Sequence, residues 1–294
     1  MARPHHQRRT GGLPGRRGGR AAGRPDVAVV LRPRDGISGS TASAAIRRGR
    51  RRLSHDGRIS FNEPGHLGAA DVNQRNRHDR WLMGLLRARA DAVLIGDGTL
   101  RAAVAHVWTP DYIFPQDAAA FAALRRREGR TPVPWLVVVS QTGELPADAE
   151  VWRGRMPVVV VTPRGRGHGV RSMKHRRRVR LLELGTDTVD VRQLMAILAR
   201  QFEVRTLLCE GGARTYGALL RAGCVDEEFL TICPLVIGSG SAGRPRPSLV
   251  EGATFMPGAA PRLRLCSIRQ AGDYLFLRSK IYRLPRGAGR RTSR

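Results

Sequence analysis

The residues of this 294-residue chain whose types and spacing could do chemistry lie in the turn Glu210-Gly211-Gly212. The turn follows a short apolar run, residues 206–209, that is typical of a buried strand. After it, apolar side chains recur at helical spacing over residues 213–220, and Gly223 can supply a left-handed stop. Such a turn points unpaired backbone N–H groups and the positive end of a helix dipole at a ligand. Phosphate suits this geometry, although two adjacent glycines also serve backbone geometry alone.

The segments around this turn predict alternating strands and helices. Helices are expected over 79–90, 121–127 and 191–202, and buried strands over 92–95, 136–139, 158–161 and 229–237. Pro234 cannot donate to a ladder, so a break is expected there. Strands at 263–268 and 274–280 read as an antiparallel finish around Gly272-Asp273. The pattern favours an α/β domain with a mainly parallel sheet, whose ligands bind beyond the carboxyl ends of the strands.

Composition excludes several classes of protein. No run of about 18 apolar residues exists, and Arg8-Arg9 is followed by Gly, Pro and Arg rather than by the apolar region of a signal peptide, so we expect neither a membrane span nor secretion but a cytoplasmic protein. The four cysteines are widely spaced and show no metal-binding pattern, so we expect reduced core thiols and no metal site. The net charge of +28 suggests nucleic acid as a partner, but aromatic residues are not interleaved with the arginines. A basic surface explains the charge equally well.

Three segments of the chain differ in amino-acid composition. Residues 1–52 are rich in Arg, Gly and Pro and have one short apolar run, so we interpret them as a disordered or poorly packed extension. They could also be an RNA-binding arm or a targeting peptide. Residues 53–283 carry the periodic patterns of a single folded domain, and residues 284–294 form a basic tail.

Several motifs occur together and in order, and together they carry a family likeness. They are Ala-Asp-Ala-Val-Leu-Ile-Gly-Asp-Gly-Thr at 90–99, Leu-Val-Val-Val-Ser at 136–140, Leu-Leu-Cys-Glu-Gly-Gly at 207–212, Ala-Gly-Cys-Val-Asp-Glu at 222–227 and Phe-Leu-Thr-x-x-Pro at 229–234. This set resembles the reductase domain of bacterial riboflavin biosynthesis, the dihydrofolate-reductase-like pyrimidine reductases. The resemblance implies an α/β fold with a mixed, mainly parallel sheet flanked by helices. It also implies NADPH as cofactor, a small-molecule substrate and a homodimer.

The resemblance also implies roles for particular residues. Gly211, Gly212, Ala213, Arg214 and Thr215 match the cradle for the NADPH pyrophosphate, and Thr99 and Ser140 match cofactor contacts. Glu210, Arg87 and Asp56 match substrate contacts, and no catalytic acid or base is assigned. For the 2′-phosphate of NADPH the candidates are Ser140, Arg164 and Arg166. Local structure offers an alternative at each position: a helix cap at Thr99, turns at Ser140 and Asp56, a salt bridge at Glu210 and a solvated helix end at Arg87.

The chain departs from the family pattern in three ways. It lacks the deaminase motifs H-x-E and P-C-x-x-C, which implies a stand-alone reductase. Arginines occupy five of the six positions 47–52, where the family has an apolar strand, and residues 100–106 lack the family's Asp followed by Arg, which hold cofactor and substrate phosphate. The leading hypothesis is a 5-amino-6-(5-phosphoribosylamino)uracil reductase. The alternatives are a reductase of another pterin or heterocyclic imine and a basic nucleic-acid-binding protein on a reductase scaffold.

Overall fold

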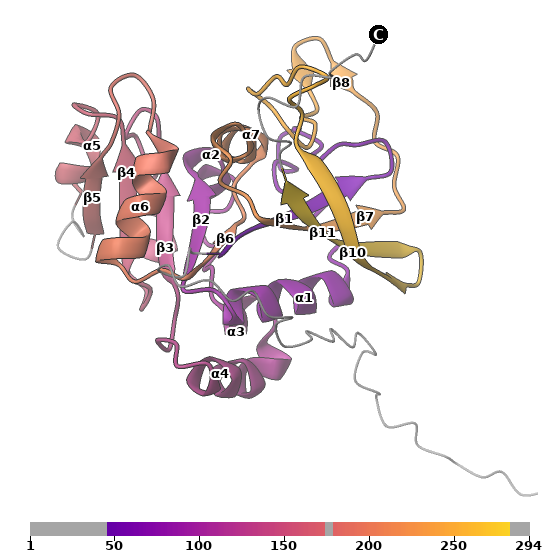
Figure 1. Ribbon diagram of the computed structural model, residues 1–294, viewed down its shortest axis with the longest axis horizontal. Helices are drawn as coiled ribbons and strands as arrows, with labels where there is room; N and C mark the ends of the chain where they lie inside the picture. The colour runs from indigo at the N-terminus through magenta and orange to yellow at the C-terminus, as the bar shows by residue number, and fades with distance from the viewer. Residues whose placement is uncertain (1–45, 174–178, 283–294) are drawn as a thin grey trace, which may run out of the picture. The chain divides into compact units, whose positions relative to one another are not determined.

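The computed structural model describes residues 46–173 and 179–282 (Figure 1). These residues form a nine-stranded sheet in the order β10-β11-β7-β1-β6-β2-β3-β4-β5, in which the pairs from β7 to β5 are all parallel. β11 pairs with β7, and β10 with β11, in antiparallel fashion. The strands are β1 (Ile46–Ser54), β2 (Ala92–Gly96), β3 (Trp135–Val139), β4 (Val158–Thr162), β5 (Val179–Glu183), β6 (Thr206–Cys209), β7 (Glu227–Cys233), β10 (Arg262–Ala271) and β11 (Tyr274–Tyr282).

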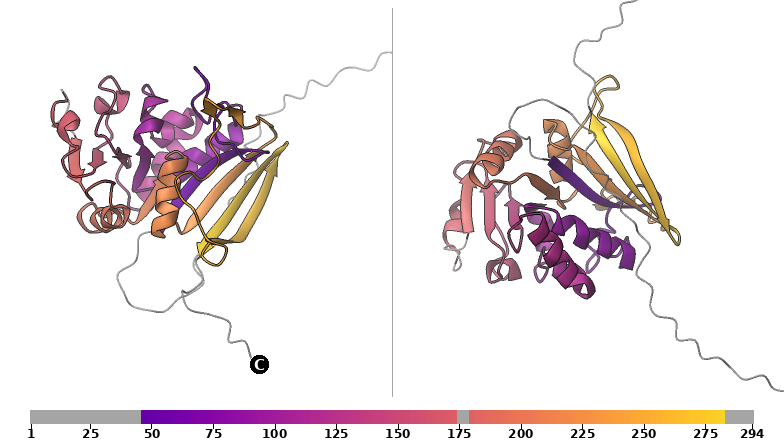
Figure 2. Two further views of the ribbon diagram at one scale, coloured as in Figure 1. Left: turned by 90° about the horizontal axis from the view of Figure 1, so that it is seen from above. Right: turned by 60° about the horizontal axis from the view of Figure 1, so that its bottom comes forward.

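Helices cover both faces of this sheet (Figure 2). On one face, Leu82 and Leu86 of α1 (Arg77–Ala88) pack in a buried cluster with alternate side chains of β2 and β3. On the other, Leu194 and Leu198 of α6 (Val191–Gln201) share a cluster with the intervening side chains of those strands and with α7 (Ala213–Ala222). Because strands buried on both faces need no polar alternation, β2 and β4 are continuous apolar runs whose residues are all buried.

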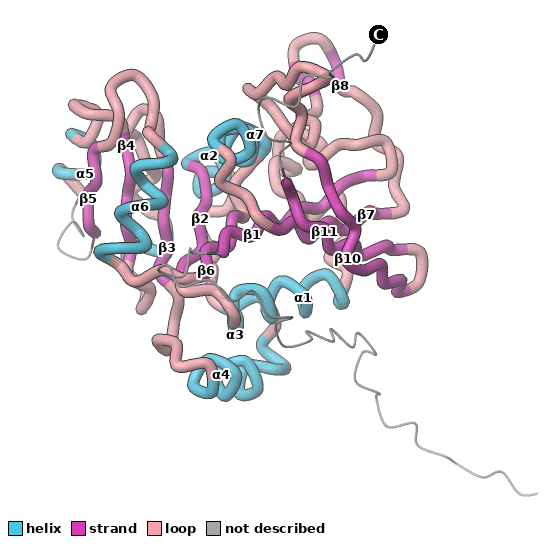
Figure 3. Tube along the Cα trace, viewed as in Figure 1, coloured by secondary structure: helices cyan, strands magenta, loops and turns pink. Residues whose placement is uncertain are grey.

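Shorter elements connect these layers. They are α2 (Asp97–Arg101), α3 (Pro110–Ile113), η1 (Pro115–Asp117), α4 (Ala118–Arg127), η2 (Glu150–Trp152) and α5 (His168–Arg171). The segment between β7 and β10 is mostly loop, with one short antiparallel pair, β8 (Gly240–Ser241) and β9 (Arg244–Pro245) (Figure 3).

Most elements match the sequence prediction. The predicted α/β class with a mainly parallel sheet is confirmed, as are the antiparallel finish and the strand break before Pro234. Gly223 ends α7 with φ +70°, the left-handed conformation expected of it. The unit β6-α7-β7 does not join neighbouring strands, because β1 lies between β6 and β7 and pairs with both. A crossover helix can pass over an intervening strand without changing the parallel order.

The main correction concerns the boundary of the folded domain. Residues 46–52, which the sequence analysis placed in the extension, belong to β1 at the centre of the sheet. The arginine run did not read as a strand because the carboxylates that neutralise it lie elsewhere: Arg50 and Arg52 pair with Asp79 of α1, and Arg47 pairs with Asp226. Residues 1–45 and 283–294 lie outside the described residues.

Two smaller findings differ from expectation. α5 and β5 lie between residues 168 and 183, where the sequence analysis predicted no helix or strand. Three of the cysteines are buried thiols as expected, but Cys266 is exposed on β10. In the part of the chain that the structure describes, no helix has the length and apolar character needed to cross a membrane.

Candidate active site

A pocket of about 1200 Å³ opens beyond the carboxyl ends of β2 and β6, beside the second half of β1. Its described lining includes nine arginines, at positions 50, 51, 52, 75, 80, 87, 101, 214 and 246, but only three carboxylates, Asp97, Glu210 and Glu251. A cleft lined by charges of one sign concentrates ligands of the other sign. The pocket therefore suits a ligand that carries phosphate groups.

The Glu210-Gly211-Gly212 turn forms one wall of this pocket. Gly211 and Gly96 make room for Thr215: a Cβ on Gly211 would lie 2.8 Å from Thr215 Cβ, and a Cβ on Gly96 would lie 2.6 Å from its hydroxyl oxygen. Gly212 differs, because the nearest atom to a Cβ there would be Thr99 Oγ1 at 3.9 Å. Among the described residues, no side chain caps α7. Its first N–H groups therefore lack a capping acceptor and stand beside open space, which fits an anion.

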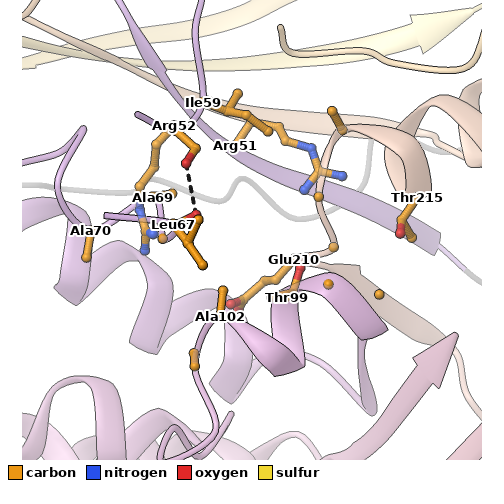
Figure 4. A pocket seen from close by; sticks show the side chains of 18 of the residues that line it. Arg51, Arg52, Ile59, Leu67, Ala69, Ala70, Thr99, Ala102, Glu210 and Thr215 are labelled. Atoms are coloured by element: carbon orange, nitrogen blue, oxygen red, sulfur yellow. Dashed lines mark hydrogen bonds between the residues drawn. The ribbon is translucent and has the colours of Figure 1, made fainter. Parts of the chain in front are cut away.

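Glu210 and Arg87 form a bidentate ion pair in the pocket wall. Arg87 donates from Nε to Oε1 and from Nη2 to Oε2, and each hydrogen bond is 2.8 Å long. Arg87 is 1% exposed, and its Nη1 also donates to the carbonyl of Thr109. Burial alone would raise the pKa of Glu210, but Arg87 outweighs it and keeps the pKa below its usual range. In Figure 4 the Glu210 side chain points toward Ala102 and away from Thr215.

His106 extends this network. Arg87 Nη2 lies 3.0 Å from His106 Nε2, and because a guanidinium only donates, Nε2 must accept and the ring proton sits on Nδ1. Burial, followed by the charge of Arg87, lowers the pKa of His106 to about 3. The ring contacts Trp108 and Tyr112 edge-on, with centroids 4.8 and 4.7 Å away. His106 is therefore a neutral, fixed imidazole at physiological pH.

The arginines of β1 form the opposite wall. Arg52 pairs with Asp79 Oδ2 at 2.6 Å, and Asn73 donates to the same oxygen at 2.6 Å, while Arg50 pairs with Oδ1. Burial would raise the pKa of Asp79, but the two guanidinium groups hold it well below its usual range. In Figure 4, Arg51 extends on the side of Thr215 and Arg52 on the side of Ala69 and Ala70. Strand alternation explains this, since successive side chains point to opposite faces.

Comparison with known proteins places this fold and pocket in a family. The family described as "RibD C-terminal domain" matches residues 50–277. The chain belongs to the RibD C-terminal domain family. A 2,5-diamino-6-ribosylamino-4(3H)-pyrimidinone 5′-phosphate reductase from Archaeoglobus fulgidus is 26% identical over 231 residues, which cover 78% of this chain and 95% of that relative. The predicted resemblance is therefore confirmed.

Solved structures agree on the fold. A pyrimidine reductase-like protein from Corynebacterium diphtheriae superposes with a TM-score of 0.63 at 20% identity, covering 82% of this chain and 93% of the other. RibD from Acinetobacter baumannii gives a TM-score of 0.61 at 19% identity over 82% of this chain, which spans only 59% of that longer protein. These similarities confirm the predicted dihydrofolate-reductase-like fold.

In this RibD-type domain, most of the predicted site residues meet around one pocket. Glu210 and Arg87 line it, as do Thr99 and the residues of the cradle, Gly211, Gly212, Ala213, Arg214 and Thr215. The side chains of Glu210 and Arg87, predicted separately as substrate contacts, are bound to each other.

Ser140 and Asp56 lie outside the pocket lining. Ser140 is fully buried at the end of β3, where its hydroxyl donates to Asp97 Oδ2 at 3.0 Å and accepts from the N–H of Gly143. Asp56 accepts from the N–H groups of Ile237 and Gly238, at 3.1 and 2.6 Å, and so fastens the turn after β1. Ser140 thus contacts Asp97, which lines the pocket, without lining the pocket itself.

Sequence reasoning missed Arg51, Arg52 and His106 as pocket residues. The arginines were assigned to the extension, and no local pattern distinguishes a single histidine in a loop. The run of arginines that ends at Arg52, shortly before the Asp56-Gly57 turn, was a usable signal, because a strand entering that turn brings its last residues to the same edge of the sheet.

Proposed function

We propose that the protein is an NADPH-dependent reductase of a ribosylaminopyrimidine 5′-phosphate in riboflavin biosynthesis. The observation that carries the proposal is the placement of two unlike sites on one cationic pocket. The uncapped α7 N terminus at Gly212 suits a diphosphate, and the Arg87–Glu210 pair offers a fixed carboxylate to a ligand rich in donors. The named relative with 95% coverage supports the substrate class.

The cofactor would be held by the glycine turn and α7. The N–H groups after Gly212 and the side chains of Thr99 and Arg214 line the space beside the turn. When bound, the nicotinamide supplies the hydride. The excess of arginines attracts the phosphate groups of both ligands, and Glu210 does not repel the diphosphate because its side chain points elsewhere (Figure 4).

The substrate would be oriented by Glu210. Arg87 fixes both oxygens of this carboxylate, whose remaining lone pairs can accept from hydroxyl or amino groups of the substrate. Hydride transfer to C1′ opens the ribose to a ribityl chain, and an imine carbon protonated on its nitrogen accepts hydride readily. The protein then needs to supply alignment and electrostatics rather than a strong base.

Substitution of Glu210 by Gln tests this role. Glu210→Gln keeps the shape and one acceptor oxygen, so we expect unchanged NADPH affinity and a fall in turnover on the order of a hundredfold from misplacement of the acceptor. Asp226→Asn is the matched control, since Asp226 is also held by two bonds from an arginine, Arg47, but lies outside the pocket. Loss of NADPH binding with normal turnover at saturation would make Glu210 a structural anchor of the turn and refute its substrate role.

The choice of substrate needs a direct comparison. The 2,5-diaminopyrimidinone ribosylamine 5′-phosphate and its deaminated uracil analogue differ only in the group at ring position 2. NADPH oxidation measured with each in turn identifies the preferred one. Absence of oxidation with both, in protein that binds NADPH, would favour the reduction of another heterocyclic imine. We also propose a cytoplasmic location, which the three buried free thiols support.

We further propose that a second copy of the chain covers the outer face of β10 and β11. Leu263, Leu265 and Ile268 are about half exposed, at 52, 50 and 50%. The register shift between Leu265 and Ser267 keeps Ile268 on the same face as the two leucines. An exposed apolar edge strand pairs readily with another chain. Light scattering should show a dimer that Leu265→Lys converts to a monomer, while Arg264→Ala on the opposite face should leave it intact; a monomeric wild type would refute the dimer.

A further inference from the structure

Arg51 is a buried guanidinium that faces the pocket. The residue is 5% exposed and lines the pocket. Nη1 donates to the carbonyls of Arg50 and Cys209, at 2.9 and 3.4 Å, and Nη2 to Cys209 Sγ at 3.3 Å. Its Cζ lies 4.0 Å from the centre of the Tyr216 ring.

Arg51 differs from its neighbours in having no counter-ion among the described residues. The other arginines of β1 pair with carboxylates: Arg47 with Asp226, Arg48 with Glu227, and Arg50 and Arg52 with Asp79. Arg51 forms no ion pair with any residue in 46–173 or 179–282, and its buried Nε has no hydrogen-bond partner there.

Glu228 does not serve as the missing counter-ion of Arg51. Glu228 accepts a hydrogen bond from the Tyr216 hydroxyl, and it forms no ion pair with Arg51 within the described residues. Burial raises the pKa of Glu228 by more than the Tyr216 hydrogen bond and the charge of Arg51 lower it. A buried cation without a paired anion is costly, and proteins retain such groups where a ligand supplies the missing charge. Arg51 is one of the residues that line the pocket, where a ligand can supply that charge.

The position of Arg51 indicates which charge it meets. Cys209, which accepts from Arg51, directly precedes Glu210, and Tyr216 belongs to the first half of α7. The guanidinium therefore lies beside the glycine turn, and in Figure 4 it extends on the side of Thr215. Two independent cationic features, the uncapped helix N terminus and a buried unpaired arginine, thus converge on one part of the pocket.

We propose that Arg51 is the counter-ion of a ligand phosphate, which it binds together with the N terminus of α7. The ligand is a phosphate or diphosphate anion that accepts charge-assisted hydrogen bonds from the Arg51 guanidinium and from the N–H groups of α7. The proposal that Arg51 binds a phosphate does not depend on the proposed function; only the assignment of this phosphate to NADPH rests on it. The place beside the glycine turn assigns it to the diphosphate of the dinucleotide rather than to the 5′-phosphate of the substrate.

The test uses Arg51→Met and Arg51→Lys in the full-length chain, with Arg47→Met as the matched control on the same strand. Calorimetric titration with NADPH, inorganic pyrophosphate and ribose 5-phosphate measures binding, and urea unfolding without ligand measures stability. For Arg51→Met we expect the Kd of NADPH and pyrophosphate to rise about ten- to a hundredfold. The unfolding midpoint should stay the same or rise, because an unpaired buried charge is removed. Arg47→Met should lower the midpoint and leave every Kd unchanged.

The outcomes separate the possibilities. A rise confined to ribose 5-phosphate would keep Arg51 as a phosphate ligand but move it to the substrate. Unchanged Kd values for all three probes would overturn the proposal. If Arg51→Met does not fold, Arg51→Lys decides: loss of the planar fork should still weaken pyrophosphate several-fold, and an unchanged Kd refutes the role. If the protein binds pyrophosphate through Arg51 but binds neither NADPH nor the pyrimidine, Arg51 is a phosphate ligand and the proposed reductase function is refuted.

Discussion

Gly212→Val is the sharpest test of the proposed cofactor cradle. Gly212 has φ −67° and ψ −178°, an extended conformation that valine adopts without strain. A Cβ at this position meets only Thr99 Oγ1, at 3.9 Å. The new methyl groups would therefore project into the space between the starts of α2 and α7, where the diphosphate is proposed to lie.

The structure allows the cost to folding and the cost to binding to be compared. Valine is a poorer N-cap than glycine, which should lower the free energy of unfolding by no more than about 1 kcal/mol. Binding should lose at least one charge-assisted hydrogen bond to phosphate, worth about 1.5–3 kcal/mol, so the Kd of NADPH should rise about ten- to a hundredfold or more. The loss of binding therefore exceeds the loss of stability.

The assay is a titration of NADPH fluorescence, paired with urea unfolding of the ligand-free protein. Gly258→Val is the matched control, because Gly258 is exposed, lies outside the pocket lining, and would have no described atom within 4 Å of a Cβ added to it. We expect wild-type NADPH affinity for the control. Wild-type affinity for Gly212→Val as well would refute the cradle, and a collapse of the fold would show that Gly212 serves the turn rather than a ligand.

Other parts of the chain give three further predictions. NADPH should be preferred over NADH. The double substitution Arg164→Ala and Arg166→Ala, at two exposed positions after β4, should reduce this preference about ten- to a hundredfold. Equal Michaelis constants of the wild-type protein for NADPH and NADH would refute the preference. Below pH 6.5, His106 binds a proton in the unfolded chain but not in the folded protein, where its pKa is about 3. Acidification toward pH 3 should therefore lower the free energy of unfolding by about 1.4 kcal/mol per pH unit through this residue. His106→Gln should therefore flatten the fall of the urea midpoint with pH, and an unaltered slope would contradict the buried neutral imidazole. Deletion of residues 1–45 should leave NADPH affinity unchanged, because the described pocket lining begins at Arg50, while loss of RNA or DNA retention on the same deletion would assign nucleic-acid binding to that segment.

Local patterns in the sequence were enough for much of the sheet and for the glycine turn. β2, β3, β4 and β6 are short apolar runs bounded by turn residues, and strands of this kind are buried on both faces whatever lies around them. The stop at Gly223 and the strand break before Pro234 depend on the backbone chemistry of single residues. The order of the motifs along the chain indicated the family, which hydrophobic periodicity alone cannot identify.

The tertiary structure decided the charged parts of the molecule. β1 is a central strand although its sequence is mostly arginine, because Asp79, Asp226 and Glu227 reach it from other elements. Glu210 and Arg87, 123 residues apart, were each predicted to contact substrate, and only the fold brings them into a bidentate pair. Apolar burial is determined by the side chain itself and leaves a periodic trace in the sequence. The burial of a charge depends on a partner that can lie anywhere in the chain, and it leaves no such trace.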